Sequence, residues 1–172
     1  MIYDAFPRGY QPYRHWLSRI WNEELPLALL VAINPNKATD TIDDQMVTFV
    51  TRLLQGLDGK LPCGGFVVVN CCDIRDPDPK NLQAHAKPVS EYNLANIREK
   101  LNCCDFAIAA WGITNYGTIV NEMRKTVTEI LMESGKPVYC FSPKGLPIYC
   151  NMRNVNAKDG RWSEVPVLFQ TS

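Results

Sequence analysis

The sequence predicts a three-layer α/β/α domain with a mainly parallel, four-stranded central sheet. Four short apolar runs recur along the chain, and segments with apolar residues at helical spacing separate them. Uninterrupted apolar runs are typical of parallel strands that helices cover on both faces. We expect one domain over residues 1–172, with its core at about 25–150 and with extensions at 1–24 and 151–172 packed on it.

The four expected strands are short and apolar. They are residues 27–33 (LALLVAI), 65–70 (GFVVVN), 105–111 (DFAIAAW) and 137–141 (PVYCF). For two further segments the sequence allows two alternative structures. Residues 13–21 (YRHWLSRIW) fit either a helix or a strand. Residues 165–169 (VPVLF) either add an edge strand or clamp the C-terminus, and Pro166 favours an edge position.

A helix is expected before each strand after the first. One covers residues 44–57, with Asp43 available as its N-cap, and Asp43 and Asp44 are both better explained as caps than as catalytic groups. Ser90 is positioned to cap the next helix, and the third ends at Gly135. Their apolar positions are, in order, Val47, Val50, Leu54 and Leu57, then Leu94, Ile97 and Leu101, then Val120, Met123, Val127, Ile130 and Leu131.

Composition argues against several classes of function. The formal net charge is zero and no basic block is present, which disfavours nucleic acid as a partner, although separate basic residues can still form a local patch. No apolar run approaches the roughly 20 residues that span a bilayer, so we expect no membrane association. The first residues lack the pattern of a secretion signal, so we expect a cytoplasmic protein. A homo-oligomer remains open.

The cysteines and histidines do not suggest a metal site. The seven cysteines include two adjacent pairs but no CxxC, and there are two histidines. We therefore expect no disulfide framework, no bound metal and no cofactor. Cys71 and Cys72 lie near the site proposed below, but His85 is the only nearby histidine, and we expect no cysteine catalysis.

The expected site lies in the loops that follow the four strands, because ligands of open parallel sheets bind beyond the carboxyl ends of the strands. Asn34 and Asn70 each end an apolar run, where an amide either contacts a base edge or water or ties down a turn. Trp111 is either a stacking platform or a core residue. The expected ligand-binding residues are Asn34, Pro35, Asn36, Lys37, Asn70, Asp73, Arg75, Trp111, Gly112, Asn115, Tyr116, Ser142 and Lys144.

Charged residues in these loops suggest two further roles. Arg75 and Lys144 are suited to neutralise a phosphate, and surface or ion-pair roles remain alternatives. If the protein is an enzyme, Asn34 and Asp40 are the candidate catalytic residues, since they would position a water molecule.

At these residues the chain resembles the uncharacterised family DUF1643. Its members have a strand ending in Asn-Pro-Ser-x-Ala-Asp, an Asp-rich helix start, a strand ending in Asn and a strand ending in Trp-Gly. The matching segments here are Tyr13 to Trp21, Ile33 to Ala38 with Asp43 and Asp44, Val69-Asn70 with Arg75, and Ala110-Trp111-Gly112, so the resemblance extends to about Pro147.

A more distant resemblance is to the uracil-DNA glycosylase superfamily, particularly its mismatch-specific branch. It implies a glycosylase-like fold in which Asn34 orients water, Asn70 reads the base edge and the loop from Ser142 approaches the sugar-phosphate. This chain departs from it, because Gly145 to Cys150 (GLPIYC) lacks the histidine of the corresponding motif, and Asn36 replaces a smaller residue.

Three functions follow as hypotheses. The first is a protein that binds, sequesters or senses a small nucleotide or nucleobase-containing ligand. The second is an N-glycosidase-like hydrolase that acts on a nucleotide or nucleic-acid base. The third is a protein-interaction module on the same fold.

Overall fold

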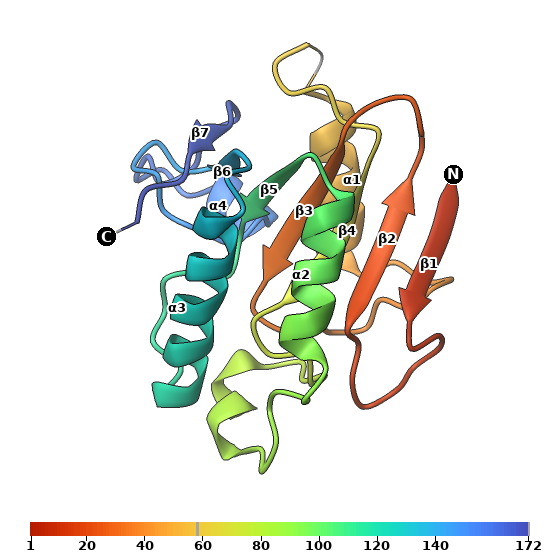
Figure 1. The fold of residues 1–172 in the computed structure, drawn as a ribbon. Coiled ribbons are helices and arrows are strands. Elements are labelled where there is room, and N and C mark those ends of the chain that lie inside the picture. Colours follow the sequence, from red (N-terminus) through yellow and green to blue (C-terminus); the bar gives the residue numbers. More distant parts are fainter. Residues whose placement is uncertain (58, 172) are drawn as a thin grey trace.

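The computed structural model describes residues 1–57 and 59–171, and it contains one seven-stranded mixed sheet (Figure 1). The strand order is β1-β2-β4-β3-β5-β6-β7. The expected four strands form the middle of this sheet and are parallel to one another. They are β3 (Leu27–Ala32), β4 (Gly65–Asn70), β5 (Phe106–Ala109) and β6 (Val138–Cys140). The prediction of a four-stranded sheet was therefore incomplete.

Three strands extend the parallel centre at its two edges. Residues 13–21, which fitted a helix or a strand, contain β2 (Trp16–Ile20), which pairs antiparallel with β4. The strand β1 (Ile2–Phe6) pairs antiparallel with β2 and was not predicted. At the other edge β7 (Val167–Leu168) pairs antiparallel with β6, as the position of Pro166 favoured. The strand form of β2 has a physical reason, since Trp16 and Leu17 pack into different cores on opposite faces of the sheet.

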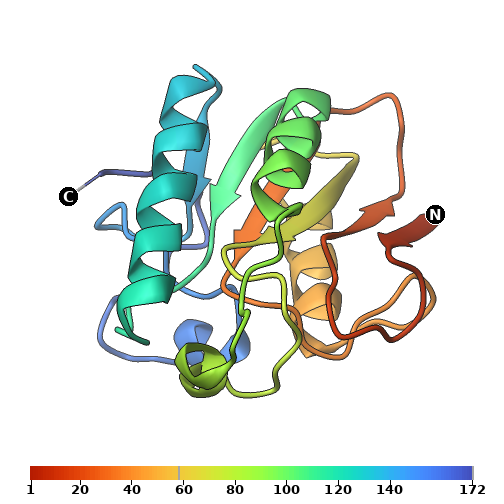
Figure 2. The same ribbon diagram turned by 60° about the horizontal axis from the view of Figure 1, so that its bottom comes forward.

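Helices cover both faces of the sheet (Figure 2). On one face, α2 (Asn93–Cys103) and α3 (Thr118–Glu133) pack on a core that includes Leu29 and Val31. On the other, α1 (Gln45–Gln55) packs on a core that includes Leu30. The remaining helices are the short 3₁₀ helix η1 (Pro79–Ala84) and α4 (Met152–Val155). In the described part of the chain, no helix is long and apolar enough to cross a membrane.

Two expected helix caps have other partners. The side chain of Asp44, not that of Asp43, accepts the hydrogen bond from the backbone N–H of Val47 and caps α1. Ser90 does not cap α2, which starts after Tyr92 without a side-chain cap, and its hydroxyl donates instead to Asp73. The third helix ends as expected, with Gly135 in the left-handed region directly after it.

Candidate functional site

Three segments that are distant in sequence meet at the carboxyl ends of β3 and β4. The residues before β2 run antiparallel to the loop after β4, with a bridge between Tyr13 and Ile74 and a 2.8 Å hydrogen bond from the Arg75 N–H to the Pro12 carbonyl. The loop after β3 joins them, because the Asp76 N–H donates to the Pro35 carbonyl at 3.2 Å. Two strand-end loops and the approach to β2 therefore form one contact region.

Two arginines lie side by side in this region. Arg14 is completely buried and Arg75 is 8% exposed. Each donates through Nη1 to the carbonyl oxygen of Ala38, at 3.3 Å from Arg14 and 2.9 Å from Arg75, and Arg75 Nη1 also donates to the Asn36 carbonyl at 2.5 Å. The Nε and Nη2 atoms of both side chains are buried without a hydrogen-bond partner among the described residues. The pair therefore has four buried donor atoms that lack an acceptor among the described residues.

No carboxylate neutralises this pair. The charge of Asp44 acts on both arginines, but its Oδ1 accepts from Val47 N and its Oδ2 from Ala38 N, and no ion pair joins it to either arginine among the described residues. Burial lowers the pKa of Arg14 to about 9, with the charge of Arg75 adding to the effect and that of Asp44 opposing it. Burial also lowers the pKa of Arg75. The arginine pair therefore lacks a counter-anion.

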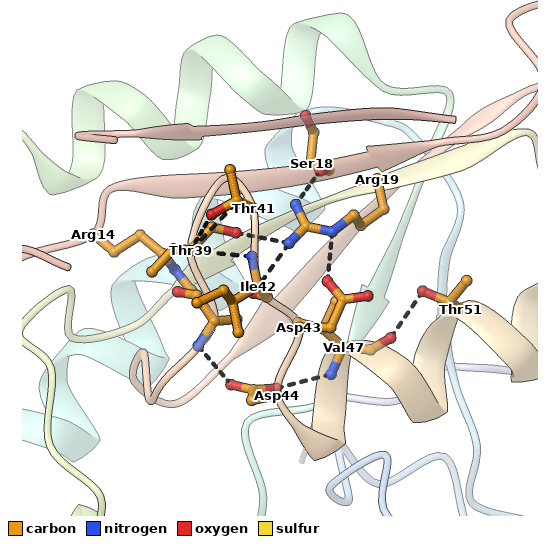
Figure 3. A network of polar contacts seen from close by, with 11 residues as sticks. Arg14, Ser18, Arg19, Thr39, Thr41, Ile42, Asp43, Asp44, Val47 and Thr51 are labelled. Atoms are coloured by element: carbon orange, nitrogen blue, oxygen red, sulfur yellow. Dashed lines mark hydrogen bonds and ion pairs between the residues drawn. The ribbon is translucent and has the colours of Figure 1, made fainter. Parts of the chain in front are cut away.

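A third buried arginine, Arg19 on β2, has a hydrogen-bond acceptor for each nitrogen of its guanidinium (Figure 3). Arg19 Nε donates to Asp43 Oδ1 at 2.7 Å, and its Nη1 and Nη2 donate to the carbonyls of Ser18 and Thr39 at 2.7 Å. None of its nitrogens is buried without a partner. Arg19 thus fixes the loop before α1 to β2. In contrast, Arg14 and Arg75 have N–H donors without an acceptor among the described residues.

Asn70 is the last residue of β4, as expected, whereas Asn34 lies two residues beyond the end of β3. Asn70, which is completely buried, has neither side-chain atom in a hydrogen bond with a described residue. Asn34 is half-buried, and its Nδ2 donates to the Asp76 carbonyl at 2.8 Å, so its amide also ties two loops together. Next to it, Pro35 is buried, whereas Asn36 and Lys37 are exposed.

The expected residues that follow β5 and β6 lie in different surroundings. Trp111 is 3% exposed and packs edge-on against Phe169, so its ring belongs to the core. Tyr149 covers Gly112, and its hydroxyl is 3.3 Å from that of Tyr116. The other three are an exposed Asn115 that accepts from Gly117 N and Asn121 Nδ2, a buried Ser142, and an exposed Lys144. No described hydrogen bond joins this group to the arginine pair.

The acidic candidates are already engaged. Asp40 accepts from the Gly9 N–H at 2.7 Å, which secures the loop between β1 and β2. Asp73 is completely buried, and its carboxylate accepts from His15 Nδ1 at 2.7 Å and from the Ser90 N–H at 2.7 Å. His85 is paired in a similar way with Asp76, whose pKa stays lowered despite burial because His85 and two further groups donate to it.

Sequence reasoning missed Arg14 and His15 as site residues. Both precede a strand that was itself left open, and their partners are far away in the sequence, Ala38 for Arg14 and Asp73 for His15. It also missed Tyr10, whose ring lies 4.8 Å from the Arg75 guanidinium carbon. One signal was available, since a charged residue beside an apolar strand needs a partner once the strand is buried.

Comparison with known proteins gives one match. The curated proteins and the solved structures yielded no significant similarity to this chain. A family model described as "Protein of unknown function (DUF1643)" matches residues 14–148, which contain both members of the arginine pair. Since this match covers well over half of its length, the chain belongs to the DUF1643 family.

Proposed function

We propose that the protein binds a small nucleotide at the carboxyl ends of β3 and β4, with the phosphate on Arg14 and Arg75. The observation that carries this proposal is the pair of adjacent buried guanidiniums whose Nε and Nη2 atoms have no described acceptor. A guanidinium presents its N–H groups as a planar fork that matches the oxygens of a phosphate. An anion between the two side chains would both accept these hydrogen bonds and offset the like charges.

Electrostatics supports an anion over a neutral ligand. Burial and the neighbouring charge of Arg75 lower the pKa of Arg14 to about 9, so the charged form of Arg14 is destabilised when no anion is present. A bound anion reverses this effect and gains the full interaction in a place where water does not screen it. The site therefore favours phosphate through charge as well as through geometry.

The buried amide of Asn70 supports a nucleobase as the second part of the ligand. An amide offers a donor and an acceptor side by side, which complements the edge of a base, and neither atom of Asn70 has a described partner. This role agrees with the distant resemblance to uracil-DNA glycosylases, which we retain as a hypothesis for the fold and for Asn70. We leave Trp111 out of the proposal because its ring is buried against Phe169.

Calorimetry of the whole chain tests the proposal. The titrants are inorganic phosphate, a set of nucleosides, and the corresponding mono-, di- and cyclic nucleotides. We expect binding of nucleotides and weaker binding of inorganic phosphate. In Arg75→Met the affinity for both falls at least about tenfold, since a charge-assisted hydrogen bond contributes about 1.5–3 kcal/mol. Arg98→Met is the matched control, because it removes the same charge from an exposed position on α2 and should leave affinity unchanged.

Two results separate the parts of the proposal. If phosphate and nucleotides bind equally well to wild type and to Arg75→Met, the anion site is wrong. If phosphate binds through Arg75 but no nucleotide binds more tightly than phosphate, the anion site stands and the nucleobase assignment to Asn70 is wrong. Chromatography of the titrated mixture then distinguishes a retained nucleotide from a released base, which would favour the hydrolase hypothesis.

A further inference from the structure

A cavity of about 360 Å³ lies between the connection from β1 to β2 and the segment before α2. Its walls include Pro7, Pro12, Tyr13, Lys87 and Tyr92, and His15 forms part of the lining. His15 is 8% exposed and belongs to none of the contacts that hold the arginine pair. Neither Arg14 nor Arg75 lines the cavity, although Pro12 and Tyr13 in its wall also contact the loop that carries Arg75.

The buried side chain of Asp73 holds the imidazole of His15 in one orientation. Its Nδ1 lies 2.7 Å from Asp73 Oδ2, and the Asp73 side chain is fully buried. Ser90 donates its N–H to Asp73 Oδ1 at 2.7 Å, and its hydroxyl donates to Oδ2. A carboxylate oxygen that already accepts from Ser90 is an acceptor for His15 as well, so this geometry favours the His15 tautomer with its proton on Nδ1.

The other imidazole nitrogen is left free by this arrangement. His15 Nε2 takes part in no described hydrogen bond, and it is not one of the fully buried unpartnered atoms, so it is accessible. With the proton on Nδ1, Nε2 carries a lone pair. A carboxylate behind an imidazole whose free nitrogen borders a cavity is the arrangement of a general base.

Two features with positive charge border the same cavity, the side chain of Lys87 and the N-terminal end of α2. Lys87 lines it, and so do Ser90, Glu91 and Tyr92, which directly precede the first turn of α2. That turn contains no acidic residue and has no side-chain cap, so the positive end of the helix dipole is not offset there. Glu91 is the one carboxylate in the lining, and it is exposed. Lys87 and the start of α2 are therefore the places at this cavity where an anionic group of a substrate would bind.

We propose that this cavity hydrolyses a phosphoester, with His15 as the general base. His15 Nε2 removes a proton from a water molecule as the water oxygen forms a bond to phosphorus. The bond from phosphorus to the ester oxygen breaks on the side opposite the water, that oxygen takes a proton from solvent, and Nε2 then returns its proton to solvent. Asp73 is a positioning residue that keeps the other proton on Nδ1 and stabilises the imidazolium between the two transfers. Lys87 binds a phosphoryl oxygen.

The test uses the whole chain with bis(p-nitrophenyl) phosphate as diester and p-nitrophenyl phosphate as monoester. We expect turnover of at least one of them, and a fall in kcat of at least about 100-fold in His15→Gln, because general-base catalysis contributes about 10²–10⁴. Lys87→Gln should raise KM with little change in kcat. The matched control is His85→Gln, since His85 also pairs with an aspartate, Asp76, but does not line the cavity.

The role of Asp73 is tested by a pH profile and by the tautomer of His15. In wild type the rate should fall on the acid side as Nε2 takes up a proton, while Asp73, Tyr13, Lys87, Glu91 and Tyr92 are the other ionisable groups around it. Asp73→Asn should lower kcat and move that acid limb, which a merely structural contact would not do. Nitrogen NMR should find the His15 proton on Nδ1 in wild type.

Three results would overturn the proposal. They are hydrolysis of neither ester by the wild type, an undiminished rate in a folded His15→Gln variant, and a wild-type His15 that carries its neutral-form proton on Nε2. Near-UV circular dichroism establishes that the variants are folded. Because none of these measurements involves Arg14 or Arg75, they can fail while the nucleotide site stands, and the reverse also holds.

Discussion

Arg14 and Arg75 donate to the same acceptor, the carbonyl oxygen of Ala38, from two segments that are 61 positions apart in the sequence. This carbonyl and that of Asn36, which Arg75 also contacts, do not neutralise two guanidiniums, and the carboxylate of Asp44 accepts from backbone N–H groups instead. Native proteins rarely leave buried charges in this condition unless a ligand completes the site.

Removing one guanidinium should stabilise the protein when no ligand is present. Arg14→Met replaces a fully buried charge by an apolar side chain of similar length, and Arg75 still donates to Ala38. Replacing even paired buried charges by apolar residues of similar volume often raises stability by about 1–4 kcal/mol, so we expect a gain of this order for Arg14. Urea unfolding in a buffer free of phosphate and other oxyanions measures the change. An equal or lower stability of the variant would show that the arginine pair is not strained.

The same substitution gives a pH dependence with a defined sign. The native-state pKa of Arg14 is lowered from 12.5 to about 9, so below about 9 its charge destabilises the native state by a constant amount. As the pH rises above about 9 the native protein releases this proton before the unfolded chain does, and stability increases. The advantage of Arg14→Met over wild type should therefore shrink between pH 8 and roughly 10.5. A difference that stays constant over this range contradicts the lowered pKa.

The sequence predicted the middle of the sheet because each central strand is an apolar run whose two faces are both covered. Residues 65–70 are the clearest case, since β4 has these bounds in the structure. The bounds and nature of β1 and β2 were less accessible, because β1 (IYDAF) mixes polar and apolar residues at an exposed edge. Its pairing depends on contacts with β2, and short edge strands carry little local signal.

Two of the four loops expected to form the site, those after β3 and β4, contact each other in the structure, but their individual contacts were not predictable from the sequence. Arg75 was among the candidate phosphate ligands. Its neighbour Arg14 was not, because it lies in the segment before β2, far from the expected loops in the sequence. Similarly, the partner of His15 is Asp73, 58 residues away. Such pairs are set by how the chain folds back on itself, which local periodicity does not encode.

The contact of Arg19 with Asp43 should contribute strongly to stability. The Arg19 side chain is fully buried and its Nε donates to Asp43 at 2.7 Å, so Asp43→Asn leaves a buried charge without its counter-charge (Figure 3). We expect a loss of about 2–3 kcal/mol, because the carbonyl contacts of Arg19 persist. Denaturant unfolding measures it. The control is Asp159→Asn, at an exposed pair with Arg161, which should leave the free energy of unfolding unchanged. An equally small effect of Asp43→Asn would show that the contact of Arg19 with Asp43 does not stabilise the fold.

Gly112 should tolerate no side chain. Its φ is +75°, and an added Cβ would lie 2.2 Å from Cζ of Tyr149. Gly112→Ala should therefore lower the free energy of unfolding by about 2–4 kcal/mol. The control is Gly135→Ala, which has a similar φ of +68° but open space around it, and it should cost about 1–2 kcal/mol. Equal losses in the two variants would mean that Tyr149 does not cover Gly112.

Thiol reactivity offers a test of the core. Six of the seven cysteines are buried and Cys103 is exposed. Burial raises the pKa of Cys72, Cys104 and Cys150 to about 12, which keeps them protonated and unreactive at pH 8. We expect an aromatic disulfide reagent to modify one thiol quickly in the native protein and all seven in denaturant. Rapid modification of a second thiol without denaturant would contradict the packing described above.

Nitrogen-proton NMR of the arginine Nε–H groups tests the central claim most directly. During titration with inorganic phosphate, and then with the nucleotide that binds best, the Nε–H signals of Arg14 and Arg75 should shift together and saturate at one ligand per chain. The Nε–H signal of Arg19 should stay in place, because Asp43 already accepts its proton. Signals of Arg14 and Arg75 that do not move, or that move no more than that of Arg19, would show that no anion occupies the arginine pair.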